Sequence, residues 1–540
     1  MKELFLGLDC STQSLTGTVI NYRSKEIICE EVVRYDEDLP AYGTKNGVIM
    51  DDNPSRVHSD PLMWVDALEL LLERLEMDYD IIDKIKVISG SAQQHGTVYL
   101  SAEFEEKLRE LNHHTSIKEQ IRGFLTRSSS PVWMDSSTSA QCKEIRESLS
   151  GREKVIKITG SNTFERFSGP QIRKFYQQKP QAYKETAQIH LVSSFLASIL
   201  SGQNAPIDHG DGAGMNLMNI TRKEWDQQAL DATAPELRSK LPPLVNSDKK
   251  IGTISRYFIN KYSFSPDTII TAWSGDNPNS LIGLGLTEPG SFAISLGTSD
   301  TFFGVLKEPY LDFQEQAHIF GSPTGDYMGL ICYKNGSLAR EAIKNEFNLT
   351  WKEYSQILRE TRAGNHGKIM LPYFFPEIVP LVLNPKVHRF GLAEDDCEGN
   401  VRGIIEAQFL SMRLHSRWIR KEPTKIHATG GAAANEEILQ VAADIFQTPI
   451  AKFKTTNSAC LGAALRAAKA YYGKKNKNIR WETFGREFIE NQKKDIIHPN
   501  RKNKKLYNSM VEVYKRFEDY IVKGKEDPEE FRQAFIKTYF

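Results

Sequence analysis

Short apolar runs alternate with polar turns at the start of the chain. Residues 3–9 and 16–21 are apolar runs separated by a hydroxyl-rich tip, a pattern that predicts a β-hairpin. Residues 60–77 follow with leucines at helical spacing, and residues 84–91 have the pattern of another strand. Strands interleaved with helices continue to about residue 250. The first half therefore predicts an α/β domain.

The same pattern begins again near residue 265. A strand over 268–273 leads through a polar turn into an apolar helix over 280–286. Strands over 290–296 and 301–305 then enclose a second polar tip, Gly297-Thr-Ser-Asp. Two halves that each contain a polar-tipped hairpin indicate a duplicated α/β architecture.

The chain has 540 residues, which is too long for one hydrophobic core. We therefore predict two domains, 1–265 and 266–540. Further elements are expected in the second: helices over 402–419, 435–446 and 458–472, and a strand over 424–428. The helix over 458–472 is rich in Ala and Gly and is expected to pack closely. A charged tail from about residue 475 is expected to form a loop and surface helices rather than a third core.

Charge and composition exclude several classes of protein. Lys and Arg together equal Asp and Glu at 69 each, so bulk charge gives no attraction for nucleic acid or an anionic membrane. No run approaches the roughly 18 apolar residues of a membrane span, and the first apolar run is too short for a signal peptide. The six cysteines show no metal-ligand spacing with His, so we expect small buried hydrophobes. We expect a cytoplasmic monomer or homodimer with no nucleic acid or membrane partner.

The two hairpin tips are candidate phosphate sites, because the chain has no GxxxxGK[ST] loop. Tight turns direct successive backbone N–H groups into one concavity that suits anionic oxygens. Ser11, Thr12, Thr298 and Ser299 add hydroxyl donors, and Gly297 permits close approach of the backbone. Each tip alone is more simply an ordinary turn. Two tips together could clamp a triphosphate across a cleft between the domains.

Asp9 and the Gly430-Gly431 pair extend this set. Asp9 ends the first strand and could hold Mg²⁺, which prefers few carboxylates and several waters. Gly430 and Gly431 lie between a strand and a helix and would allow a nucleoside to approach the backbone. The alternatives are a turn residue for Asp9 and a plain strand-to-helix turn for the glycines.

Six segments together resemble the FGGY family of carbohydrate kinases. They are LGLDCSTQS (6–14), SGSAQQHGTVY (89–99), SGDNPNSLIGLG (274–285), SFAISLGTSDT (291–301), ATGGAAANEEILQ (428–440) and NSACLGAALRA (457–467). The resemblance extends to about residue 473 with the motifs in family order. It implies an α/β fold of two actin-like (ribonuclease-H-like) domains, the first binding sugar and the second ATP. The active site would lie in the cleft between them, with ATP and Mg²⁺ as cofactors.

Three further segments narrow the resemblance. QQHG (93–96), ERFSGPQI (165–172) and DGAGMNL (211–217) are most similar to family members that phosphorylate xylulose. The implied reaction is ATP-dependent phosphorylation of D-xylulose to D-xylulose 5-phosphate. A kinase for L-xylulose, ribulose, gluconate or glycerol is one alternative. An actin-like switch, in which ATP moves the domains to grip a protein, is another.

Asp276 is the candidate general base. A carboxylate within hydrogen-bond reach can take the proton that a sugar hydroxyl loses as the γ-phosphate arrives. Asp276 follows a strand and precedes a helix, so the pattern alone fits a helix N-cap equally well. The family match to Gly275-Asp276-Asn277 favours the catalytic role.

The resemblance also assigns sugar contacts. Asn277 matches one of them, and an amide suits a hydroxyl because it both donates and accepts. Gln94, His95 and Arg166 match others. Without the family context, His95 would more simply be a structural histidine and Arg166 a surface charge.

On the nucleotide side, Gly431, Ala432 and Asn435 match the adenosine motif, and Trp351 lies where related kinases carry an aromatic. Stacking of Trp351 on a base is plausible, although a Trp at helical spacing is as readily a core residue. One segment departs from the family. Many relatives carry Trp-x-Asp-x-Arg near the sugar, whereas this chain has no Arg after Trp133 and Asp135, so the role of Asp135 stays open.

Overall fold

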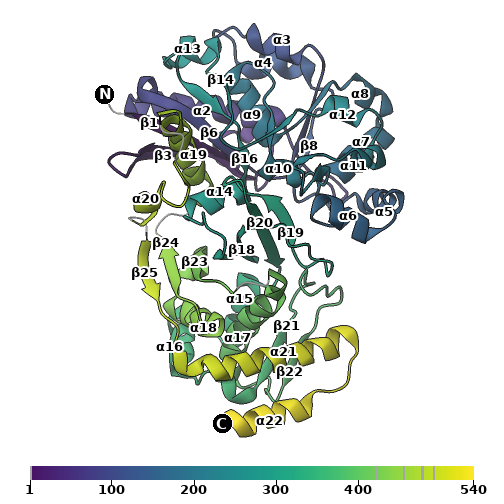
Figure 1. The fold of residues 1–540 in the computed structure, drawn as a ribbon, viewed down its shortest axis with the longest axis vertical. Helices are drawn as coiled ribbons and strands as arrows, with labels where there is room; N and C mark the ends of the chain where they lie inside the picture. The colour runs from purple at the N-terminus through teal and green to yellow at the C-terminus, as the bar shows by residue number, and fades with distance from the viewer. Residues whose placement is uncertain (1–2, 420–421, 454–456, 476–478, 491–492) are drawn as a thin grey trace.

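The computed structural model describes residues 3–419, 422–453, 457–475, 479–490 and 493–540. Within these ranges the fold is built on two seven-stranded sheets, drawn one above the other in Figure 1 with helices around them. The C-terminus lies at the far end of the second part of the molecule.

The first sheet has the order β14-β15-β6-β1-β2-β3, with β16 also paired to β6. Its strands are β1 (Leu4–Cys10), β2 (Ser14–Asn21), β3 (Glu26–Arg34), β6 (Ile85–Ala92), β14 (Lys250–Thr253), β15 (Ile269–Thr271) and β16 (Ser274–Gly275). β1 and β6 are buried along nearly their whole length, as expected for central strands of a sheet that is covered on both faces.

The second sheet has the order β19-β20-β18-β17-β23-β24-β25. Its strands are β17 (Ser291–Leu296), β18 (Asp300–Leu306), β19 (His318–Gly321), β20 (Tyr327–Tyr333), β23 (Lys425–Thr429), β24 (Ile450–Phe453) and β25 (Lys493–Ile497).

The two sheets repeat one arrangement. In the first, β1, β2 and β3 are antiparallel neighbours, and β6 and β15 extend the sheet in parallel on the other side of β1. In the second, β17, β18 and β20 form the antiparallel set, and β23 and β24 form the parallel extension of β17. This shared order confirms the duplicated architecture predicted from the two hairpins.

Smaller elements surround the sheets. The short strands are β4 (Ile49–Met50), β5 (Val57–Ser59), β7 (Thr97–Leu100), β8 (Ser130–Pro131), β9 (Gln188–Leu191), β10 (Ile207–Asp208), β11 (Met218–Asn219), β12 (Glu224–Trp225), β13 (Leu244–Val245), β21 (Ile369–Pro372) and β22 (Val387–Phe390). The helices of the first half are α1 (Tyr35–Asp38), α2 (Pro61–Tyr79), α3 (Phe104–Arg109), α4 (Ile117–Ile121), α5 (Ser139–Ser148), α6 (Arg152–Thr159), α7 (Ser168–Gln178), α8 (Pro180–Glu185), α9 (Val192–Ser201), α10 (His209–Ala213), α11 (Gln227–Thr233), α12 (Leu237–Lys240) and α13 (Arg256–Tyr262). Those of the second half are α14 (Asp276–Gly283), α15 (Ser337–Glu346), α16 (Trp351–Glu360), α17 (Cys397–His415), α18 (Glu436–Phe446), α19 (Ser458–Lys475), α20 (Arg486–Glu490), α21 (Lys504–Lys523) and α22 (Glu529–Tyr539).

Helix α19 packs closely, as its Ala- and Gly-rich sequence predicts. A Cβ added at Gly7 of β1 would lie 2.3 Å from the Cys460 carbonyl oxygen, and one added at Gly462 would lie 2.0 Å from the Asn279 carbonyl oxygen. The buried Arg466 of α19 donates to the carbonyl oxygens of residues 90, 247 and 272. A helix from late in the chain is thereby fixed on the first sheet.

The sheets do not divide at the predicted boundary between residues 265 and 266. β15 and β16 follow that point in the chain but lie in the first sheet. Helix α14 starts directly after β16, and α19 packs against both α14 and β1. The elements around the start of α14 therefore join the two parts of the molecule.

The C-terminal tail differs from its expected loop and surface helices. β25 pairs with β24 as the edge strand of the second sheet. Helix α21 buries a face of seven apolar side chains in the largest core cluster: Leu506, Tyr507, Met510, Val511, Val513, Tyr514 and Phe517. In Figure 1, α21 and α22 lie across the end of the second part of the molecule. The tail contributes to an existing core and does not form a third one.

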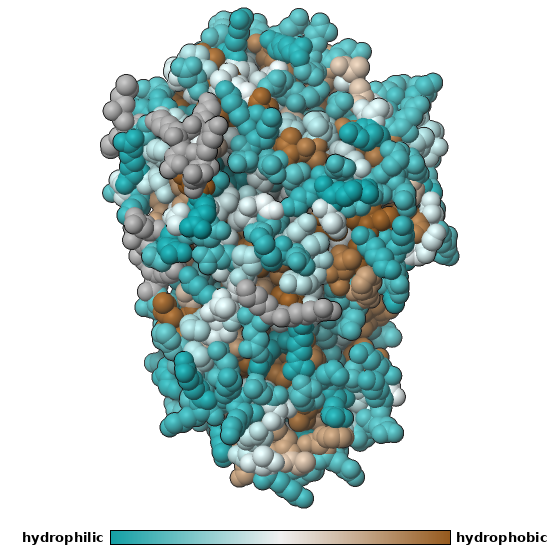
Figure 2. Space-filling view, viewed as in Figure 1, coloured by the Kyte–Doolittle hydropathy of each residue, from teal (hydrophilic) through white to brown (hydrophobic). Residues whose placement is uncertain are grey.

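The face seen in Figure 2 is mostly hydrophilic, with smaller hydrophobic areas between the hydrophilic ones. Within the described ranges, no helix is both long enough and apolar enough to cross a membrane. Cys10, Cys29, Cys142 and Cys460 are buried thiols, as predicted, whereas Cys332 and Cys397 are partly exposed.

Candidate active site

Asp276 is the first residue of α14 and follows β16 without a loop. The N-cap position belongs to Gly275, so Asp276 is not the capping residue that the pattern left open. Its Oδ1 accepts hydrogen bonds from its neighbour Asn277, from the backbone N at 2.7 Å and from Nδ2 at 3.0 Å. A Cβ at Gly275 would lie 2.4 Å from Cγ of Gln94. Glycine is therefore required before Asp276 because the Gln94 side chain lies against that backbone.

Asp276 has a strongly perturbed ionisation. Burial raises its pKa to about 7, and the negative charge of Asp9 adds to the shift. Burial also raises the pKa of Asp9 to about 6. A carboxylate whose pKa lies near neutral pH is matched to accepting a proton from a hydroxyl.

Gln94 connects Asp276 to a second buried carboxyl group. Gln94 Oε1 accepts from Asn277 Nδ2 at 3.1 Å. Burial raises the pKa of Asp211 well above its usual range, while the Ser193 hydroxyl, which donates to Asp211 Oδ2, and the neighbouring Gln94 amide oppose that rise. The negative charge of Asp276 also raises the pKa of Asp211, so the two carboxyl groups are close. These contacts hold the Gln94 amide in one orientation beside the candidate base.

His95 occupies a strained turn between β6 and β7. Its φ of 75° lies in the left-handed region, which costs a non-glycine residue about 1 kcal/mol or more. Its Nδ1 lies 2.8 Å from the carbonyl oxygen of Gly214 and must therefore carry the hydrogen and donate it. Burial lowers the pKa of His95 to about 3, and the charge of Arg166 lowers it further. His95 is neutral, and its Nε2 is left as an acceptor.

Arg166 lies close to His95 and reaches the second sheet. Its Nη2 is 3.0 Å from Nε2 of His318 on β19, and its guanidinium carbon lies 5.2 Å from the centre of the Phe164 ring. The charge of Arg166 lowers the pKa of both His95 and His318. Of the residues that the resemblance assigns to sugar, Asp276, Asn277 and Gln94 are joined by hydrogen bonds, and His95 and Arg166 interact electrostatically. Gln94 and His95 are neighbours in the chain, which brings the two groups together.

The first hairpin tip is tightly fixed. Ser11 Oγ donates to the Ser14 carbonyl oxygen at 3.0 Å, so this hydroxyl is used within the turn. Thr12 Oγ1 accepts from Trp133 Nε1 at 2.8 Å and keeps its own hydrogen available. A Cβ at Gly47 would lie 2.0 Å from the Thr12 carbonyl oxygen. Trp133 and the loop at Gly47 therefore pack directly on the tip.

The second tip is open to solvent at its centre. Thr298 and Ser299 are exposed, and a Cβ at Gly297 would meet only the Ser299 carbonyl oxygen, at 3.3 Å. The tip is anchored by the buried pair of Asp300 and Arg340, whose atoms are 2.6 and 3.0 Å apart.

Gly430 connects this second tip to the candidate nucleoside site. Its φ of 88° lies in the left-handed region that favours glycine. A Cβ added at Gly430 would lie 2.5 Å from the Leu296 carbonyl oxygen, so no other residue fits there. The glycine turn is therefore held at the end of β17, directly before Gly297. An added Cβ at Gly431 would meet nothing within 4 Å.

A cavity of about 700 Å³ lies beside this turn. It includes all four residues predicted for the adenosine side: Trp351, Gly431, Ala432 and Asn435. Trp351 starts α16 and is 43% exposed, so it is not a core residue. Asn435 caps α18 through Oδ1 and donates from Nδ2 to Ser355 Oγ at 2.8 Å. The cavity offers an aromatic face, an amide and open backbone, a lining that suits a heterocyclic base and ribose.

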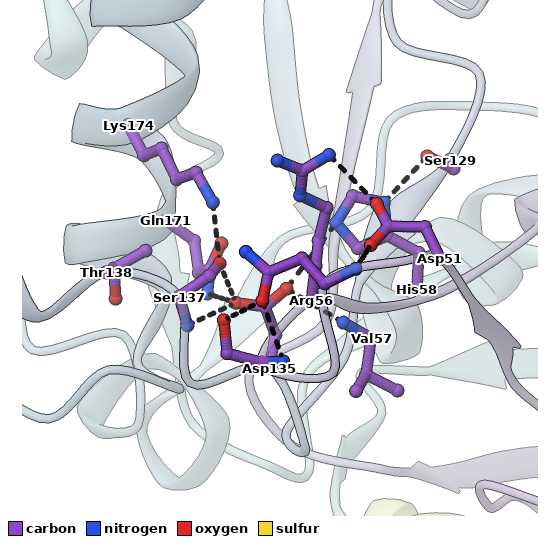
Figure 3. Close-up of polar contacts among 12 residues, drawn as sticks. Asp51, Arg56, Val57, His58, Ser129, Asp135, Ser137, Thr138, Gln171 and Lys174 are labelled. Atoms are coloured by element: carbon purple, nitrogen blue, oxygen red, sulfur yellow. Dashed lines mark hydrogen bonds and ion pairs between the residues drawn. The ribbon is translucent and has the colours of Figure 1, made fainter.

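Asp135 is fully engaged inside the protein (Figure 3). Its two oxygens accept from Val57 N, Gln171 Nε2 and both donors of Ser137, and His58 Nε2 lies 3.5 Å away. Burial opposes ionisation, but these donors outweigh it and hold the pKa of Asp135 well below its usual range. Ser137 stands at the Arg position of the Trp-x-Asp-x-Arg pattern. Its Oγ accepts a hydrogen bond from Lys174 Nζ at 2.6 Å. The carboxylate joins β5, α7 and the Trp133 loop.

Known proteins resemble the chain along nearly all of its length. The models of the FGGY family of carbohydrate kinases match residues 127–283 (N-terminal domain) and 292–471 (C-terminal domain). "Xylulose kinase 2" of Arabidopsis thaliana is 43% identical over 87% of this chain and 87% of its own. The "Xylulose kinase" of Rattus norvegicus is 40% identical over 86% of this chain and 88% of its own. The chain belongs to the FGGY family of carbohydrate kinases.

The fold of this FGGY kinase also matches solved structures. The ligand-bound xylulose kinase from Lactobacillus acidophilus superposes with a TM-score of 0.80 at 19% identity, over 96% of this chain and 98% of the other. The predicted fold class, two domains of the actin-like, ribonuclease-H-like type, is confirmed, and the family makes the chain an ATP-dependent sugar kinase.

Three residues of this FGGY kinase that contact the candidate site were not singled out from sequence. Asp211 and Gly214 belong to the DGAGMNL segment, whose only signal was the family match. His318 gives no signal in the sequence, because a lone histidine near a strand is usually structural. Its contact with Arg166 depends on how the two halves of the chain pack.

Proposed function

We propose that this chain phosphorylates D-xylulose to D-xylulose 5-phosphate with ATP as donor. The observation that carries the mechanism is the Asp276 carboxylate, whose pKa of about 7 suits a general base. The names of the relatives from Arabidopsis thaliana and Rattus norvegicus support the choice of sugar.

The chemistry assigned to Asp276 is one proton transfer. The terminal hydroxyl of the ketose loses its proton to the Asp276 carboxylate as its oxygen bonds to the γ-phosphorus of ATP. The bond from that phosphorus to the β,γ-bridging oxygen breaks, and ADP leaves with the electron pair. A positioned base contributes roughly 10²–10⁴-fold to such a step, and positioning and charge neutralisation supply most of the rest.

Four side chains would orient the ketose. Neutral His95 offers Nε2 as an acceptor for a sugar hydroxyl, and Arg166 offers only donors. Asn277 and Gln94 share one hydrogen bond, and each keeps further amide atoms for sugar hydroxyls. This mixture of donors and acceptors suits a polyhydroxylated substrate.

The nucleotide would lie between the second hairpin tip and the cavity beside Gly431. Trp351, Gly431, Ala432 and Asn435 would contact adenosine, and Gly297, Thr298 and Ser299 would contact phosphate. Ser11 and Thr12 of the first tip would face the phosphates from the other side. Ser11 would act through backbone N–H groups of the tip more than through its hydroxyl, which is bonded to Ser14.

Asp9 fits a role in holding Mg²⁺, directly or through water. Its Oδ1 is buried without a hydrogen-bond partner among the described residues, and Asp276 adds a second negative charge nearby. No cluster of three or more His, Cys, Asp or Glu side chains that could hold a metal occurs in those parts of the chain. Mg²⁺ needs only one or two carboxylates together with phosphate and water. It would neutralise phosphate charge when bound.

Three broader expectations accompany the proposal. We propose a cytoplasmic protein that acts as a monomer or homodimer. We also propose that residues 1–265 mainly bind sugar and residues 266–540 mainly bind ATP, with the elements around α14 and α19 shared between the two domains.

A coupled assay across a panel of acceptors tests this function. ADP release should be slow with ATP alone and fast with D-xylulose, and slower with L-xylulose, ribulose, gluconate and glycerol. A better rate with another acceptor would reassign the substrate. No acceleration by any acceptor would favour the ATP-driven switch. Asp276→Ala should lose phosphorylation while ATP still binds, and wild-type turnover in that variant would remove Asp276 from the mechanism.

A further inference from the structure

His318 brings a side chain of the second sheet into the candidate ketose site. It is the first residue of the edge strand β19 and is only 6% exposed. Its Nε2 lies 3.0 Å from Nη2 of Arg166, which precedes α7 in the first half of the chain. A candidate sugar contact from one half of the chain is therefore fixed by a residue from the other.

The chemistry of this contact defines the state of the histidine. An arginine side chain has donors and no acceptor, so Nε2 of His318 must accept and cannot carry a hydrogen. The hydrogen of the neutral ring is then on Nδ1, which is buried without a partner among the described residues. Burial lowers the pKa of His318 far below its usual range, and the charge of Arg166 lowers it further. His318 remains a neutral acceptor across the physiological pH range.

Aromatic rings fix the imidazole in place. Phe164 lies edge-on to His318 with ring centres 5.0 Å apart, and Phe167 does so at 5.3 Å. Phe167 also contacts the His95 ring at 4.9 Å. The same aromatic cluster thus supports both His95 and His318, and the Arg166 guanidinium lies over one of its rings.

The strand that carries His318 is itself fixed against the first half of the chain. Ile319 N donates to Ser161 Oγ at 3.2 Å. A Cβ at Gly321 would lie 2.6 Å from the His209 carbonyl oxygen, so β19 and α10 touch through their backbones. The position of His318 therefore follows the packing of the two halves.

We propose that His318 is a positioning residue of the ketose site, which holds the Arg166 guanidinium from the second domain through Nε2. The proposal rests on the assignment of Arg166 to the sugar. It makes the affinity for the ketose depend on a residue of the domain that binds ATP, while the affinity for ATP itself does not depend on that residue.

Two substitutions separate positioning from packing. His318→Leu fills the space but removes the acceptor, whereas His318→Gln can place an amide oxygen near the position of Nε2. We expect His318→Leu to raise the KM for D-xylulose about 10-fold or more, because the substitution removes a hydrogen bond to a charged group. The KM for ATP should stay unchanged. His318→Gln should recover most of that loss. The matched control is His190→Leu, because His190 is also buried but bonds to Ser194 and Asn204 and not to a candidate sugar contact.

The outcomes decide the proposal. A wild-type KM for the ketose in folded His318→Leu overturns it. Equal defects in the Leu and Gln variants, or an equal rise in the KM for ATP, also overturn it, because they indicate a packing role only. Thermal unfolding shows which variants are folded. If His318→Leu does not fold, the Gln variant and the imidazole measurement below decide.

Imidazole ¹⁵N NMR of the full chain tests the contact without using activity. We expect His318 to be neutral with hydrogen on Nδ1, and its Nε2 resonance to shift in Arg166→Met. A hydrogen on Nε2, or no shift in that variant, overturns the proposal even if the enzyme is active. If the wild type phosphorylates no ketose, the proposed function fails, and this measurement still reports on the contact between His318 and Arg166.

Discussion

Asp9 and Asp276 lie on opposite sides of β6, at the same end of the first sheet. Asp9 on β1 pairs in register with Ser91 of β6, and Ser274 of β16 pairs with the same serine from the other side. β1, β6 and β16 are parallel, so the two carboxylates come at neighbouring carboxyl ends of strands, where open α/β sheets bind ligands. The charge of Asp9 reaches Asp276 and raises its pKa.

The pH dependence of turnover should follow from this relationship. Asp276 must be ionised to accept a proton, and its pKa in the folded protein is about 7. We expect kcat/KM for the ketose to fall about tenfold per pH unit below that value. A coupled assay from pH 5 to 9 at saturating ATP measures the acidic limb. Activity that stays constant down to about pH 5 would contradict an Asp276 base with this pKa.

The same shift predicts the effect of Asp276→Asn on stability. A carboxyl whose pKa is raised by folding contributes stability that is complete below its unfolded pKa of 3.8 and is lost as pH rises to about 7. The amide has no charge to bury, so the variant should have the higher Tm at pH 8, with the difference shrinking toward pH 4. Thermal unfolding without nucleotide or sugar measures it. A lower Tm for the variant at pH 8 would show that the ionised Asp276 is stabilising.

Sequence reasoning predicted the parts of the site that depend on local pattern. The first strand and the glycine turn at Gly430 are local features, and the structure has them within one residue of the predicted places. The predicted strand over 268–273 is shorter, as β15, and the predicted turn after it contains the short strand β16. The clustering of Asp276 with Gln94 and His95 came from a family resemblance and not from spacing, because about 180 residues separate these positions along the chain.

The rest depended on contacts that no local pattern contains. The seven apolar side chains buried by α21 repeat at helical spacing, but the charged residues between them are typical of a helix on the surface. Their burial depends on packing against α17 and α18, which lie far away in the sequence. Similarly, Asp135 reads as a surface turn residue until β5 and α7 supply its donors.

Asp135 should stabilise the fold rather than bind sugar. Asp135→Asn places an amide against donors such as Val57 N and Gln171 Nε2, and should cost roughly 3 kcal/mol of unfolding free energy with kcat nearly unchanged. The pKa of Asp135 is lowered by folding, so its contribution is present above the unfolded value near 3.8 and is lost as pH falls below it. The difference in Tm between variant and wild type should therefore shrink in acid.

The neighbouring Asp51 provides the control for Asp135, because it is exposed and its ion pair with Arg56 is worth at most about 1 kcal/mol. Asp51→Asn should leave the Tm nearly unchanged. Thermal unfolding and the KM for D-xylulose are measured for both variants. A normal Tm with a large rise in KM for Asp135→Asn would place this carboxylate on the sugar instead.

Tyr507 tests whether the C-terminal tail is part of the folded core. Its hydroxyl accepts from Arg402 Nη2 and donates to Glu406 Oε1, both at 2.7 Å, and all three side chains are buried. Tyr507→Phe leaves these charged groups one partner short, at a cost of roughly 1–3 kcal/mol. We expect a lower Tm with unchanged KM for both substrates. Tyr79→Phe, at a 37% exposed position, should have no effect. A wild-type Tm for Tyr507→Phe would mean that α21 unfolds separately from the rest of the protein. Loss of the hydrogen bonds to Arg402 and Glu406 would then leave the main unfolding transition unchanged.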